Sequence, residues 1–145
     1  MLLVGIKNIT SQTVPELGTI ALGSVYRRYC KKNECGYRTF ETDSTSVTLQ
    51  HPGIYHVTVT ATATAPAAGD IVMSLFEGAT SVATATETIT TATTEVRTLV
   101  IDQYVLVDNA CLLGTNSVAA KTLTLQNTGI ETTYTSITFN VEKVV

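Results

Sequence analysis

The stretch GIYHVTVTATATA (residues 53–65) alternates between two kinds of side chain. Tyr55, Val57 and Val59 begin one series, which continues through the alanines at 61, 63 and 65; His56 and the threonines at 58, 60, 62 and 64 form the other. Successive side chains of a strand point to opposite faces of its sheet. The apolar series therefore predicts the core face of a long strand. Because a threonine-lined strand without lysine invites pairing at a sheet edge, we expect it mid-sheet or against a neighbouring chain.

Period-two alternation recurs along the chain, and no stretch has the apolar spacing of a helix over three turns. The pattern predicts further strands at 46–49, 70–77, 81–90, 95–107, 117–126 and 134–145, with breaks at PAAG (66–69), EGAT (77–80) and DNA (108–110). Seven to ten short strands separated by turns are typical of a β-sandwich or barrel. A length of 145 residues suits one domain, spanning 1–145.

The composition is poor in charge. Charged residues make up 14% of the chain, against an ordinary share of about 25%, which favours a protein that covers much of its surface with copies of itself or a partner. The net charge of −3 argues against general nucleic-acid binding. The first residues show no basic region followed by a long apolar run, and no apolar run reaches the length of a membrane span, so we expect neither a signal peptide nor a transmembrane segment. We therefore expect a cytoplasmic protein before release, or a virion component, without membrane insertion.

Four segments resemble one family. LQHPGIYHVTVTA (49–61) is similar to the L-x-x-x-G-x-Y-x-V-x-V segment of the tumour-necrosis-factor-like jelly roll, a superfamily that includes complement-type globular heads and related bacterial and phage proteins. GDIVMSLFEGATSVA (69–83), LVIDQYVLVDNACLLG (99–114) and TSITFNVEKVV (135–145) follow in the family's order. The chain departs from the family at Val107-Asp108, where glycine commonly precedes Asp, and at a cysteine-bearing insertion within 27–38. The resemblance implies an all-β jelly-roll sandwich of about ten antiparallel strands.

The resemblance also implies a function. Such jelly rolls typically pack as homotrimers around a three-fold axis, through aromatic and small residues, which makes Tyr55, Tyr104 and Tyr134 candidates for the interface. The alternative is that each is a core residue with its hydroxyl at the surface. The chain most resembles phage-type members, which implies a non-enzymatic structural or receptor-binding protein: a virion decoration, head fibre or tail tip. Its partners would be other virion proteins or a host-surface glycan.

The segment YRRYCKKNECGYR (26–38) holds five of the nine basic residues. A basic, tyrosine-rich loop can bind phosphate, an acidic sugar polymer or an acidic protein, or dock one subunit against another. It can equally be a solvated loop with its rings packed on the end of the sandwich. The other functional hypothesis, a bacterial carbohydrate- or cell-wall-binding module, uses this loop. Its candidate partner-binding residues are Arg27, Arg28, Tyr29, Lys31, Lys32, Tyr37 and Arg38.

Cysteines and histidines give no catalytic or metal signature. Cys30 and Cys35 can form a disulfide across a tight loop or remain free thiols, and no second pair of ligands completes a zinc site. His56 with Asp43 or Asp70 is a formal Ser-His-Asp combination, but no G-x-S-x-G motif accompanies it. The acids are scattered, without a pair suited to glycoside hydrolysis. We expect no catalytic residues, no metal and no cofactor.

Overall fold

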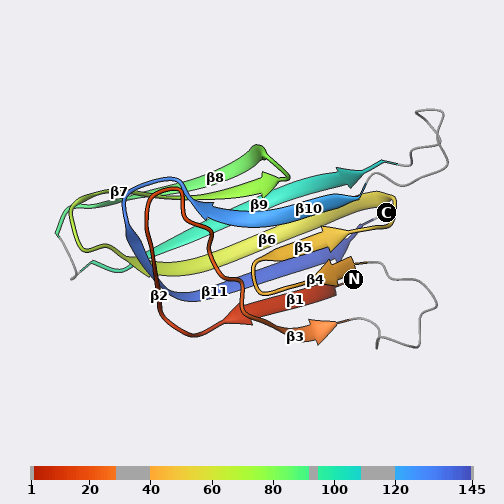
Figure 1. The fold of residues 1–145 in the computed structure, drawn as a ribbon, viewed down its shortest axis with the longest axis horizontal. Helices are drawn as coiled ribbons and strands as arrows, with labels where there is room; N and C mark the ends of the chain where they lie inside the picture. Colours follow the sequence, from red (N-terminus) through yellow and green to blue (C-terminus); the bar gives the residue numbers. More distant parts are fainter. Residues whose placement is uncertain (1, 29–39, 92–94, 109–119, 145) are drawn as a thin grey trace.

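Two antiparallel sheets pack face to face in the computed structural model, which describes residues 2–28, 40–91, 95–108 and 120–144 (Figure 1). The six-stranded sheet has the order β3(Ser24–Arg28), β1(Leu2–Asn8), β11(Thr132–Lys143), β6(Gly53–Thr64) and β9(Arg97–Val107), and β2(Gln12–Val14) also pairs with β11. The five-stranded sheet has the order β4(Phe40–Thr42), β5(Ser46–Leu49), β10(Lys121–Asn127), β7(Gly69–Glu77) and β8(Thr80–Ile89). The predicted all-β sandwich is confirmed.

β6, the strand predicted from residues 53–65, contributes large side chains to the core. Tyr55, Val57 and Val59 of β6 point between the sheets and have no exposed surface. At the other end of the strand, the small side chains of Ala61 and Ala63 are also fully buried between the sheets. Ala63 lies opposite Tyr134 of β11 in the strand register. Because Tyr134 is also fully buried, a large ring from the neighbouring strand accompanies the small side chains of β6.

The position of β6 explains its threonine series. The strand lies between β11 and β9 in the middle of the six-stranded sheet, so its backbone pairs on both sides. This confirms the mid-sheet prediction. The outward series of β6, which contains Thr58, Thr60 and Thr62, forms part of the sheet's outer face.

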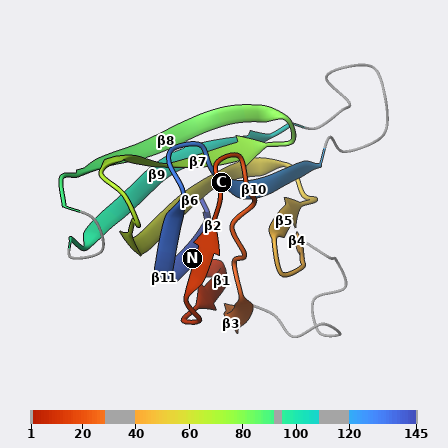
Figure 2. The same cartoon turned by 60° about the vertical axis from the view of Figure 1, so that its left-hand side comes forward.

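The two long sides of the sandwich differ. β8 lies against β9 along one side (Figure 2). On the other side, the Arg28 guanidinium of β3 lies 5.4 Å from the ring centroid of Phe40 on β4, within cation–π range.

The described part of the chain contains no helix of the length and hydropathy that a membrane span requires.

The sequence pattern does not predict β1, β2, β3 or β4. β1 reads LLVGIKN, an apolar run in which Leu3, Val4 and Ile6 are all buried, so it lacks strict alternation. β2 and β4 have three residues each, too few to show a period. β3, SVYRR, lies at the edge of the sheet and is largely exposed.

Candidate functional site

The outer face of the six-stranded sheet carries apolar side chains that the core does not use. Along β9, Leu99, Ile101, Val105 and Val107 point inward, whereas Val100, Asp102, Tyr104 and Leu106 point outward. Both series are rich in apolar residues, so the sequence of this strand alone does not reveal which faces the core. The outward side chains remain well exposed, with relative exposures of 56% for Val100, 60% for Tyr104 and 53% for Leu106.

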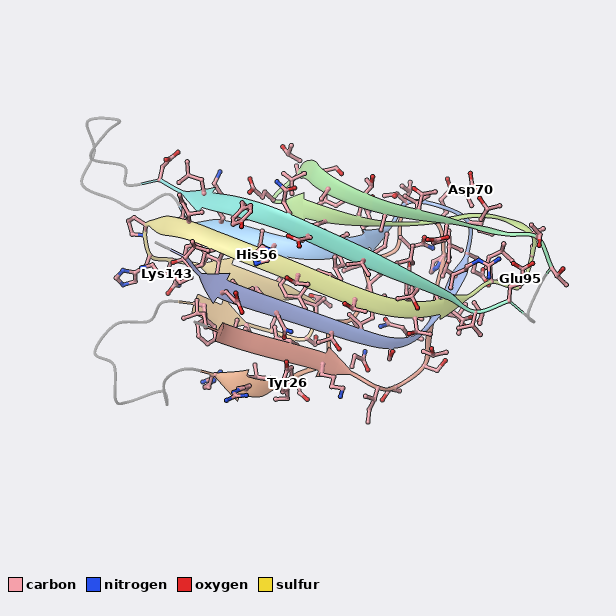
Figure 3. The ribbon with its side chains drawn as sticks, turned by 180° about the vertical axis from the view of Figure 1, so that it is seen from behind. Tyr26, His56, Asp70, Glu95 and Lys143 are labelled. Atoms are coloured by element: carbon pink, nitrogen blue, oxygen red, sulfur yellow. The ribbon has the colours of Figure 1, made fainter. Side chains whose placement is uncertain are left out.

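Neighbouring strands extend this surface. Ile54 of β6 lies opposite Leu106, and the amide of Val144, just after β11, donates a hydrogen bond of 2.8 Å to the Ile54 carbonyl. His56 lies opposite both Tyr104 and Glu142, and Figure 3 shows it on the outer side of the sheet. We call this surface the outer-face patch; its members are Ile54, His56, Val100, Asp102, Tyr104, Leu106, Glu142 and Val144.

His56 is the polar centre of the outer-face patch. Its Nε2 contacts Oδ1 of Asp102, and its Nδ1 lies 3.9 Å from Oε2 of Glu142. The imidazole also stacks on Tyr104, with 4.9 Å between ring centroids and 23° between ring planes. Two flanking strands thus hold the imidazole between two carboxylates and against an aromatic ring.

This arrangement differs from a catalytic triad. A general base needs one ring nitrogen for the nucleophile and the other for the orienting acid, but both nitrogens of His56 face carboxylates. The acids considered from the sequence lie elsewhere: Asp43 accepts from Thr45 and Ser46, and Asp70 accepts from Thr88. Among the residues that the structure describes, no group of three or more His, Cys, Asp or Glu side chains is placed to hold a metal ion.

The sequence pattern does not place Asp102 or Glu142 beside His56. His56 and Asp102 are 46 residues apart, and their contact depends on the register between β6 and β9. The sequence does contain a signal for this contact. If the segments 53–64 and 97–107 are aligned antiparallel with their midpoints opposite each other, His56 falls near Tyr104 and Asp102.

The three candidate interface tyrosines have different positions. Tyr55 is fully buried, its hydroxyl donates 2.7 Å to the His51 carbonyl, and burial raises its pKa. Tyr134 is also fully buried. Neither ring presents surface to a neighbouring chain, so both belong to the core, and of the three only Tyr104 remains a candidate for the interface.

The basic segment is described only at its start. Arg27 and Arg28 lie on β3 and are exposed. Before them, the Tyr26 ring lies over Gly5 of β1, and its hydroxyl donates 2.8 Å to Asn140 of β11 (Figure 3). The remaining candidates lie outside the described residues: Tyr29, Lys31, Lys32, Tyr37 and Arg38, together with the cysteine pair Cys30 and Cys35.

Known structures share this fold. No protein-family model and no curated protein sequence matches the chain. The globular domain of zebrafish complement 1qA protein is 9% identical, with a TM-score of 0.63, and the match covers 98% of this chain and 96% of that one. Eiger TNF from S. frugiperda is 12% identical, with a TM-score of 0.68 and coverages of 99% and 93%. PRD1 vertex protein P5 is 14% identical, with a TM-score of 0.54 and coverages of 99% and 97%.

These similarities identify the fold. The two-sheet sandwich is of the type found in tumour necrosis factor and complement 1q, as the sequence resemblance implied. At such identities the comparisons establish architecture alone.

Proposed function

We propose that this protein is a non-enzymatic structural component that assembles as a homotrimer through the outer-face patch, and that the trimer is part of a virion. One observation carries the proposal: the exposed apolar side chains of β6, β9 and the end of β11 gather on one face of one sheet. Large exposed apolar side chains that gather on one face of a folded domain are typical of an interaction site.

The hydrophobic contribution of this surface is large enough to matter. Covering the exposed parts of Tyr104, Leu106 and Val100 contributes on the order of 4 kcal/mol per copy, before the cost of association. Ile54 and Val144 adjoin them and add to the covered area. The two carboxylates of the patch, Asp102 and Glu142, oppose burial unless they are neutralised.

A second copy of the chain is the occupant that we infer for the patch. Jelly rolls of the family that the sequence resembles typically form homotrimers, and the chain adopts that fold. Its low share of charged residues, 14%, fits a protein that buries part of its surface in assembly. The virion role is supported by the similarity in fold to PRD1 vertex protein P5 and by the sequence resemblance to phage-type members.

A matched pair of variants tests the assembly surface. Leu106→Lys places a charge within the patch, and Ile9→Lys makes a comparable change at a side chain that is 76% exposed just after β1, outside the patch. We expect Leu106→Lys to raise the concentration at which the trimer half-dissociates by at least about tenfold in sedimentation equilibrium, because a buried charge is costly. Ile9→Lys should leave it unchanged. Equal effects of the two variants would argue against the patch.

The particle role has its own test. Antibody raised against the purified protein should label intact particles isolated from a lysate of the cells that carry its gene. Labelling confined to soluble protein, with clean particles beside it, would contradict a virion component while leaving the trimer standing.

The basic strand can serve recognition or assembly. Arg27→Ser with Arg28→Ser removes two exposed charges from β3. Reduced binding to host-surface glycan with an intact trimer supports recognition, whereas loss of the trimer supports docking between subunits.

A further inference from the structure

His56 lies where a single proton changes the charge of the outer-face patch. The groups that face its imidazole from the flanking strands are Asp102 and Tyr104 of β9 and Glu142 of β11. The next residue on β11, Lys143, has its Nζ 5.9 Å from the ring centroid of Tyr55, which is a core residue. Among the described residues, His56 is the one basic side chain that lies within ion-pair distance of Asp102 or Glu142.

The protonation state of the imidazole sets the charge of this cluster. With a neutral ring, Asp102 and Glu142 give two negative charges beside Tyr104; with an imidazolium, the cluster carries one. In a neutral ring one nitrogen is an acceptor and would face a carboxylate without a proton between them. An imidazolium has a proton on each nitrogen, which suits a ring with an acid on either side.

Assembly changes the balance between the neutral and the protonated imidazole of His56. In a single copy, the side chains of Asp102 and Glu142 are 63% and 49% exposed, so water solvates both charges. A neighbouring copy that covers the patch removes part of that water, and an uncompensated carboxylate becomes expensive there. The protonated ring offsets one of the two charges, so covering the patch favours proton binding.

We propose that assembly of the homotrimer is linked to proton uptake by His56, so that acidification strengthens the trimer. This inference rests on the proposed function, because it concerns regulation at the same surface. A group whose proton affinity rises on assembly stabilises the assembly below its ordinary pKa, and that stabilisation is lost as the pH rises through the raised value. The test therefore covers about pH 5 to pH 8, the range in which histidine side chains generally change charge.

Sedimentation equilibrium across that range measures the link. Each proton taken up per trimer raises the association constant about tenfold for every pH unit by which the pH falls, but only across the interval in which assembly takes up that proton. We expect wild-type protein to associate at least about tenfold more tightly near pH 5.5 than near pH 8. In the His56→Gln variant the association constant should not change with pH. His51→Gln is the matched control: it changes the other histidine, which lies at the corner before β6, and should keep the wild-type slope.

Asp102→Asn gives a second, independent readout. Removing one carboxylate should tighten the trimer near pH 8 and reduce the slope, a result that a purely structural role for the pair would not produce. A wild-type constant that changes less than about twofold, or a full slope retained by His56→Gln, would overturn the proton link while the trimer itself stands. A chain that stays monomeric at every pH would overturn both proposals.

Discussion

Replacing Asn127 by leucine removes a buried amide that holds the corner between β10 and β11. The side chain has no exposed surface. Its Nδ2 donates to the carbonyls of Val14 and Ile130 at 2.8 Å each and to that of Pro15 at 3.3 Å, while its Oδ1 accepts from the amide of Gly129 at 3.2 Å. One amide therefore connects β2, the turn after β10 and the approach to β11.

The expected loss of stability follows from the polar groups that lose their hydrogen bonds to the Asn127 side chain. Leucine fills a similar volume but leaves the carbonyl of Val14 and the amide of Gly129 without this partner, whereas the Ile130 carbonyl keeps the hydrogen bond that the Thr132 hydroxyl donates to it. An unsatisfied buried polar group costs about 1–3 kcal/mol. Since two groups are left and relaxation recovers part of the loss, we expect Asn127→Leu to lower the free energy of unfolding by about 2–4 kcal/mol.

Guanidinium unfolding at one fixed protein concentration measures this, because an oligomer's stability depends on concentration. The matched control is Gln126→Leu, on the same strand, where an exposed amide donates 2.8 Å to the Leu17 carbonyl. Water can replace that bond, so the expected loss is under about 1 kcal/mol. Asn127→Asp, which keeps the acceptor and removes the donors, covers the case in which the leucine variant does not fold. Losses at position 127 no larger than in the control would refute the reasoning.

Three further predictions concern single residues. Tyr134→Phe should keep or raise the unfolding midpoint, because among the described residues the buried Tyr134 hydroxyl has no hydrogen-bond partner; a loss above about 1 kcal/mol would disagree. Gly5→Val should cost about 1–3 kcal/mol, since a Cβ at Gly5 would lie 2.6 Å from the Tyr26 ring, and the cost should shrink with Tyr26→Ser in a double-mutant cycle. The amide of Thr45 is the main cause that lowers the pKa of Asp43. The resulting stabilisation is complete above its ordinary pKa and lost as the pH falls through the lowered value, so Asp43→Asn should flatten the acid side of the Tm profile.

Much of the architecture follows from alternation. Residues 53–64 show which face is buried because one series starts with Tyr and Val and the other contains His and Thr. β9 has apolar residues in both series, so its buried face depends on its partners. The short strands β2 and β4 owe their conformation to pairing with β11 and β5, which local sequence does not encode.

The candidate site was less accessible from sequence. Tyr104 was among the three proposed tyrosines, but Tyr55 and Tyr134 lie in the core, since each follows the inward series of its own strand. The contact between His56 and Asp102 arises from the register of two strands far apart in the chain. Residues 29–38 of the basic segment lie outside the described residues, so the binding role of the segment remains a prediction.

The molecular mass of the wild-type protein in solution tests most directly the central claim, that the chain assembles as a homotrimer. Sedimentation equilibrium at micromolar concentration near pH 6 should give 46.5 kDa, three times the 15.5 kDa of one chain. A particle of 15.5 kDa under these conditions would contradict assembly through the outer-face patch.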